Sequence, residues 1–305
     1  MSRLRSRSDE ARKSLRYSIL DGSASSAFLG LTQEYISPFA LALKATTVQI
    51  GLLSSLPNLA IALCQLAGPR LSEQHGSRKR LILRAVFLQA LLWAPILLVP
   101  YIFPGQKAWW LVGLFTLSAI AGSIASPAWW SLMSDLVPVE TRGRFFGLRG
   151  TICGFVSLAF FLIGGLVLHF SAADIFAGFA ILFGGAILFR LISWYFLSKM
   201  YDPPLLTGWW DRYSLPDLAS TLASSNLGRY IVFSSLMNFA IYLAGPFFAV
   251  YMLRDLSFSY LAYAGVTAAS SLASLVFLTF WGRRADRTGN VKVLNATSLL
   301  VPLIP

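Results

Sequence analysis

The sequence predicts an all-α membrane protein, and three observations lead to this fold class. Apolar residues make up 56% of the 305-residue chain and charged residues only 12%, with a mean hydropathy of +0.65. Soluble domains carry about 25% charged residues. The apolar residues form runs of about 20 residues, the length that a helix needs to cross a bilayer. These runs lack the period-two alternation of barrel strands, so helices are the expected spanning elements.

Eight runs are long enough to be complete spans, and a ninth begins near residue 292. The expected spans cover residues 17–42, 47–67, 81–102, 109–133, 148–170, 174–197, 229–252 and 259–281. The first run is the least apolar, because it contains Asp21, Gln33 and Glu34 among several Ser and Gly residues. Asp21 and Arg190 fall near the cytoplasmic ends of their spans, where solvation and snorkelling would explain them.

The basic residues alternate between the two sides of this predicted bundle. Of the 25 Lys and Arg residues, 21 lie in the N-terminal tail and in alternate loops, whereas the opposite loops hold Lys44, Lys107 and Arg254. Basic loops stay in the cytoplasm, so the N-terminus is predicted to be cytoplasmic. The same rule supports the first span, since the basic tail and the basic residues 78–80 need an even number of crossings between them.

A long-range repeat divides the chain. The basic segments 69–81 and 282–294 are 213 residues apart, and the same offset places the first two spans on the seventh and eighth. This recurrence predicts a repeat of six helices. The expected parts are a cytoplasmic tail at 1–16, a six-helix half at 17–199, a cytoplasmic linker at 200–228 and an incomplete second half at 229–305. The offset would carry the ninth span past Pro305, so we expect a truncated member of a longer family.

Three cytoplasmic loops carry signatures that resemble those of the major facilitator superfamily. The signature Gly-x-x-x-Asp-Arg-x-Gly-Arg-Lys matches Gly282, Asp286, Arg287 and Gly289. In the first copy Gly76 is kept, but Pro69 stands for Gly, Glu73 for Asp, Gln74 for Arg and Ser77 for Arg. A third loop reads Asp-Leu-Val-Pro-Val-Glu-Thr-Arg-Gly-Arg from Asp135 and resembles the family's signature after the fourth span.

The resemblance implies a secondary active transporter of a small solute, in which two six-helix halves rock about a central site. It also implies that the loops latch the two halves, whereas the alternative reading is that basic loops only fix orientation. The candidate latch residues are Glu73, Gly76, Asp135, Arg142, Gly143, Arg144, Gly282, Asp286, Arg287 and Gly289. The expected span at 148–170 lacks the Gly-Pro pair of drug antiporters, and the end of the span at 174–197 lacks the Pro-Glu-Ser-like sequence of sugar porters, so the subfamily stays open.

Glu34 is the leading candidate for the translocation path and for a proton carrier. An acid at membrane depth is costly and tends to face a cavity. It shares a helical face with Ser23, Ala27, Gly30 and Ser37, although a face of small residues also packs well against another helix. The further polar candidates, each of which would equally bridge helices, are Gln33, Asn58, Gln65, Gln89, Asn238 and Tyr242.

Several other classes of function lack support in the sequence. Neither Cys64 and Cys153 nor His75 and His169 have the spacing of a metal, disulfide or catalytic site, so we expect no enzyme, metal or cofactor. The net charge of +12 is explained by membrane-proximal loops, without nucleic acid. The expected protein is a monomer that crosses the cell membrane many times, with the lipid bilayer, a small solute and candidate protons as its partners. The alternative is a non-transporting membrane protein, such as a sensor or an inactive truncated remnant.

Overall fold

The computed structural model describes residues 2–74, 77–103, 105–203, 225–288 and 290–298, and within these ranges it is helical without strands. The all-α prediction is therefore confirmed. The helices are α1 (Ser2–Thr32), α2 (Ile36–Ala42), α3 (Thr47–Gln74), α4 (Arg78–Ile102), α5 (Lys107–Leu136), η1 (Val139–Thr141), α6 (Arg142–Phe170), α7 (Ile175–Ser198), α9 (Asn226–Val250), η3 (Tyr251–Asp255), α10 (Tyr260–Thr288) and α11 (Asn290–Ser298).

Six described segments are long and apolar enough to cross a membrane. They lie at Thr47–Gln65, Arg78–Ile102, Lys107–Leu136, Phe145–Phe170, Ile175–Ser198 and Gly228–Asp255. Helix α1 covers only part of the expected first span and α10 covers the eighth, and neither helix is among the six. Helix α1 is too polar to be counted as a span. Helix α10 is described only in part, because some of its side chains lie outside the described residues.

The expected first span is not continuous, because a turn at residues 33–35 separates α1 from α2. Pro38 accounts for part of this break. Proline has no N–H, so it cannot bond to the carbonyl of Glu34, four residues earlier. That carbonyl instead accepts a hydrogen bond from the hydroxyl of Tyr263 in α10, over 2.9 Å. The break therefore creates a contact between α10 and the first helices.

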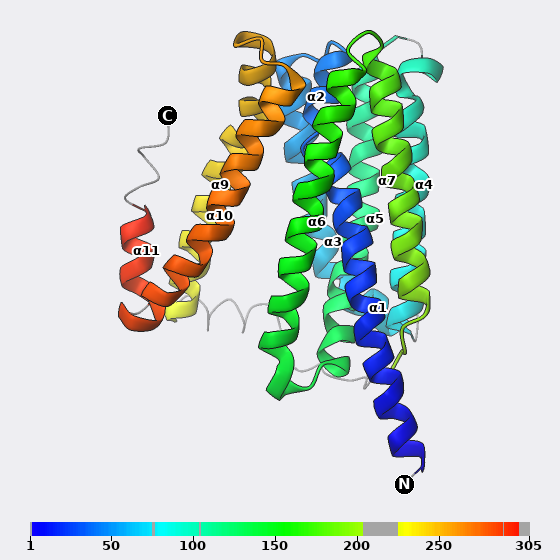
Figure 1. The fold of residues 1–305 in the computed structure, drawn as a ribbon, viewed down its shortest axis with the longest axis vertical. Helices are drawn as coiled ribbons and strands as arrows, with labels where there is room; N and C mark the ends of the chain where they lie inside the picture. The colour runs from blue at the N-terminus through cyan, green and yellow to red at the C-terminus, as the bar shows by residue number, and fades with distance from the viewer. Residues whose placement is uncertain (1, 75–76, 104, 204–224, 289, 299–305) are drawn as a thin grey trace.

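Helices α1 to α7 form a closely packed bundle, and α9 and α10, which we call the α9–α10 pair because they follow each other in the chain, stand beside it (Figure 1). Helix α10 packs against α6, and α9 packs against α2 and α3. In Figure 1 the pair meets the bundle at the end where α2 lies and diverges from it toward the end where the N-terminus lies. The two groups of helices are thus joined at one end.

The centre of the bundle is an aromatic cluster near the α2 end. The ring of Trp93 lies 5.0 Å from that of Phe183, which lies 5.0 Å from that of Phe39. Small residues bring the surrounding helices close. A side chain at Gly30 of α1 would collide with the carbonyl oxygen of Ser157 in α6, a close approach typical of helices packed within a membrane.

Candidate solute cavity and charged clusters

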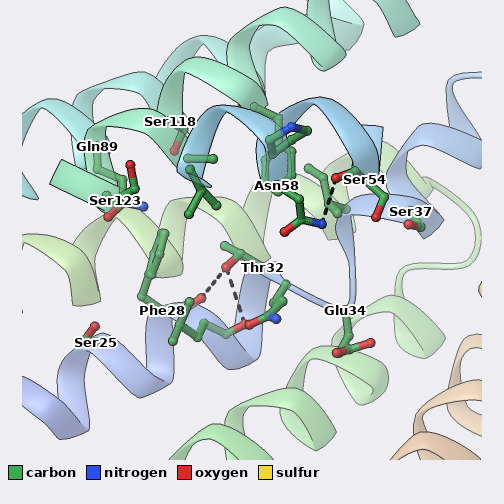
Figure 2. A pocket seen from close by; sticks show the side chains of 18 of the residues that line it. Ser25, Phe28, Thr32, Glu34, Ser37, Ser54, Asn58, Gln89, Ser118 and Ser123 are labelled. Atoms are coloured by element: carbon green, nitrogen blue, oxygen red, sulfur yellow. Dashed lines mark hydrogen bonds between the residues drawn. The ribbon is translucent and has the colours of Figure 1, made fainter. Parts of the chain in front are cut away.

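A cavity of about 1110 Å³ lies between the bundle and the α9–α10 pair. Helices on both sides contribute to its wall. The bundle provides residues such as Phe28, Asn58 and Gln89, and the pair provides Tyr242 and Thr267. Figure 2 shows polar side chains from several helices of the bundle around the cavity. Such a mixed wall is suited to a small organic molecule.

The structure brings six of the seven predicted path residues to this cavity. They are Gln33, Glu34, Asn58, Gln65, Gln89 and Tyr242. Asn238 is not among the lining residues, and its amide instead donates to the Ser234 carbonyl of its own helix over 2.7 Å. The location of the six agrees with the sequence pattern, and their role in transport stays a prediction.

Glu34 lies in the turn between α1 and α2, with an exposed side chain. In Figure 2 its carboxylate lies on the opposite side of the view from Gln89 and Ser123. Its backbone carbonyl holds Tyr263, as described above. Glu34 therefore links the cavity wall with the contact that joins α10 to the bundle.

Two neutral polar groups of the wall are buried without a hydrogen-bond partner. They are the Oε1 atom of Gln89 and the Nε1 atom of Trp93. By contrast, the amide of Asn58 donates to the Ser54 carbonyl over 3.0 Å. Buried polar groups are normally paired, so the acceptor on Gln89 and the donor on Trp93 are open positions for a ligand or water. No group of three potential His, Cys, Asp or Glu metal ligands occurs in the part of the chain that the structure describes.

Three charged side chains, two of them buried and Arg149 partly exposed, form a cluster at the wall, which we call the interior cluster: Asp21 of α1, Arg149 of α6 and Arg190 of α7. Asp21 accepts a hydrogen bond from Ser193 over 2.6 Å and lies 3.7 Å from the nearer guanidinium nitrogen of Arg149. Arg190 donates to Ser25 over 2.9 Å and lies against the ring of Phe28. All three cluster residues line the cavity.

The interior cluster corrects the sequence-based interpretation of Asp21 and Arg190. Solvation and snorkelling were expected, yet these residues are only 4% and 9% exposed. The reason is tertiary: α1, α6 and α7 meet at this level and enclose the charges between them. Periodicity along one helix indicates a polar position but does not identify the helix that covers it.

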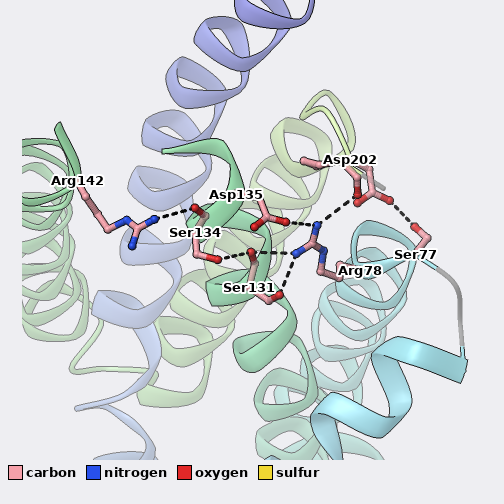
Figure 3. Close-up of polar contacts among 8 residues, drawn as sticks. Ser77, Arg78, Ser131, Ser134, Asp135, Arg142 and Asp202 are labelled. Carbon is pink, nitrogen blue, oxygen red and sulfur yellow. Dashed lines mark hydrogen bonds and ion pairs between the residues drawn. The ribbon is translucent and has the colours of Figure 1, made fainter. Parts of the chain in front are cut away.

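A second charged group, the rim cluster, surrounds Arg78 at the end of the bundle where α4 begins (Figure 3). Arg78 pairs with Asp135 over 2.6 Å and donates to both the hydroxyl and the carbonyl of Ser131. It also donates to the carbonyl of Pro203, while Ser77 donates to Asp202 over 2.6 Å. The rim cluster thus ties the starts of α4 and of the linker to the end of α5.

The rim cluster includes only part of the predicted latch. Asp135 binds Arg78, and Arg142 donates to the Ser134 carbonyl over 2.9 Å. Both contacts are made within the first half, and the contact between the halves stays a prediction. The remaining candidates lie outside the described residues, or have side chains that do: Glu73, Gly76, Gly143, Arg144, Gly282, Asp286, Arg287 and Gly289. Arg78 itself was missed, although it occupies the final basic position of the first signature copy.

The architecture and the apolar helices define a multi-pass membrane protein. The chain belongs to the Major Facilitator Superfamily, whose family model matches residues 22–304. The fold is also similar to the crystal structure of a D-xylose-proton symporter, with a TM-score of 0.57 and 14% sequence identity. That match covers 91% of this chain and 68% of the symporter chain, and at this identity it shows the fold alone. No curated protein matches the sequence.

Proposed function

We propose that the protein is a secondary active transporter that moves a small solute through the cavity by alternating access. The observation that carries the proposal is the wall of the cavity, to which both the bundle and the α9–α10 pair contribute in a chain of this superfamily. We further propose that it works as a monomer in the cell membrane with a cytoplasmic N-terminus. An ion gradient would drive the movement, so the proposal requires no chemical reaction.

Alternating access requires that the contacts at the α2 end break and reform. These contacts include the Tyr263 hydrogen bond to Glu34 and the close approach of α10 to α6 at Gly165. A Cβ atom at Gly165 would lie 2.5 Å from the Cβ atom of Ala264. Since real Cβ atoms do not approach so closely, a side chain at Gly165 should push α10 away.

We therefore expect Gly165→Ala to shift the protein toward a state that is open at the α2 end. Spin labels at Ala173 and Ser259, in a cysteine-free background, would report longer distances by electron spin resonance. Gly150→Ala is the matched control, because a Cβ atom on this residue of α6 would meet nothing within 4 Å. Identical distance distributions in the two variants would contradict the proposed opening.

Proton coupling is supported by the position of Glu34. Its carboxylate lines the cavity, and its backbone is part of the contact that must break. Protonation of this carboxylate would therefore couple solute occupancy to the separation of α10 from the bundle. The protein of similar fold is a D-xylose-proton symporter, which is consistent with this mechanism.

The test is transport by the purified protein in proteoliposomes. A thermal-shift screen selects solutes that bind, and uptake of these solutes is measured with and without an imposed pH gradient. We expect Glu34→Gln to abolish gradient-driven accumulation but to leave solute exchange at equilibrium. The control is Asp255→Asn, an exposed acid that does not line the cavity. Accumulation unchanged in Glu34→Gln would refute the coupling role, and binding without transport would favour the sensor alternative.

A further inference from the structure

We propose that Arg190, with Arg149 beside it, forms an anion-binding subsite and that the solute is an organic anion. This inference rests on the proposed transport function and adds the chemical class of the solute. It begins from the charges of the interior cluster, in which two guanidinium groups share the single carboxylate of Asp21.

Asp21 is already engaged on both of its oxygens. Oδ1 accepts the hydrogen bond from Ser193, and Oδ2 faces Arg149. Arg149 is further held by a hydrogen bond to the Ser18 carbonyl and by the ring of Trp129, 4.4 Å away. The carboxylate therefore makes its close contact with Arg149, and Arg190, which it attracts from farther away, has no direct anionic partner among the described residues.

Arg190 has a single hydrogen bond within the described residues, to the neutral hydroxyl of Ser25, and its Nε atom is buried without a partner. A buried cation without a matching anion is costly. The other acid of the wall, Glu34, is remote: eleven residues of helix separate Asp21 from the end of α1, a rise of about 16 Å. A bound anion would satisfy Arg190, whose planar group matches a carboxylate well.

The surroundings of Arg190 indicate an organic anion rather than an inorganic one. Phe28 touches Arg190 on one side and lies edge-on to Trp93 on the other, with ring centres 5.6 Å apart. The open Nε1 donor of Trp93 and the open Oε1 acceptor of Gln89 line the same cavity. A solute with an apolar body and one or more hydroxyl, keto or amide groups would meet both, whereas a small inorganic ion would not.

The test compares carboxylates with their own uncharged amides. Lactate, succinate, benzoate and 3-phenylpropionate are each titrated beside the matching amide into the purified protein, at constant pH and ionic strength. Binding is measured by thermal shift and calorimetry. We expect at least one carboxylate to bind about tenfold or more tightly than its amide, as a charge-assisted hydrogen bond would produce.

Variants test whether the preference for a carboxylate over its amide depends on Arg190. Arg190→Gln should reduce the carboxylate to the affinity of its amide, and Arg190→Lys should restore part of the difference. Arg84→Gln, an exposed arginine of α4 that does not line the cavity, should leave the preference unchanged. If Arg190→Gln does not fold, Ser25→Ala, which removes the hydroxyl that orients Arg190, should weaken the carboxylate preference severalfold.

Two results would overturn the inference: no carboxylate binds more tightly than its amide, or the preference survives in Arg190→Gln. Uptake in proteoliposomes separates this failure from failure of the proposed function. If only neutral solutes are transported, the proposed transport function is supported and the anion subsite is contradicted. Conversely, if a carboxylate binds through Arg190 but no solute is transported, the subsite is supported and the proposed transport function is contradicted.

Discussion

The rim cluster and the interior cluster use the same residue types but partner them differently. Arg78 at the rim is 4% exposed and Arg190 in the interior is 9% exposed, so burial does not distinguish them. Both also have an unpartnered Nε atom. The difference lies in the terminal nitrogens, since Arg78 meets a carboxylate and three neutral oxygens, whereas Arg190 meets one hydroxyl. An arginine whose terminal nitrogens are paired with a carboxylate holds helices together, and one whose terminal nitrogens meet only a hydroxyl is available to a ligand.

The acids of the two clusters differ as well. Asp135 at the rim is 48% exposed on its side chain, whereas Asp21 in the interior is almost fully buried. Water can therefore replace a lost partner readily at the rim, whereas in the interior it can reach the charges only from the cavity. This contrast predicts that the interior tolerates the loss of a charge much less well.

The largest expected effect is that of Asp21→Asn. The change leaves Arg149 and Arg190 without a carboxylate inside the bundle, so we expect a loss of about 3–5 kcal/mol in the free energy of unfolding. Reversible unfolding in mixed detergent micelles would measure it. The matched control is Asp255→Asn, which removes the exposed pair with Arg254 and should cost about 0.5 kcal/mol or less. Similar losses in the two variants would mean that the interior charges are solvated.

Arg78→Gln at the rim is expected to lower the free energy of unfolding by a smaller amount. The substitution removes the ion pair and the hydrogen bonds to Ser131 and Pro203. It leaves a half-exposed Asp135 that water can reach. We expect a loss of about 1.5–3 kcal/mol, the range for hydrogen bonds to a charged group. Arg80→Gln, an exposed arginine in the same helical turn, should have no measurable effect in the same unfolding assay. A loss from Arg78→Gln above that of Asp21→Asn would reverse the comparison.

The outcome of sequence reasoning differs between the two clusters for a physical reason. Hydropathy is a local property, so the runs that become α3 to α7 are visible in the sequence. The interior cluster depends on which helices meet, and nothing near Asp21 in the sequence points to Arg149 or Arg190. Arg78 is different, because its place in the first signature copy was a usable signal. The break before α2 could also have been predicted, since Pro38 lies within an apolar run.

The smallest effect distinguishes two roles of Ser77 at the rim. Its hydroxyl oxygen accepts the backbone N–H of Arg80, which caps α4, and its hydroxyl proton is donated to Asp202. Ser77→Ala removes both contacts and should cost about 1 kcal/mol in the free energy of unfolding, as for other N-cap residues. Asp202→Ala removes the contact with the Ser77 hydroxyl but keeps the cap. If the cap dominates, Asp202→Ala should unfold with nearly wild-type stability, whereas a loss as large as that of Ser77→Ala would show that the contact with Asp202 is the one that matters.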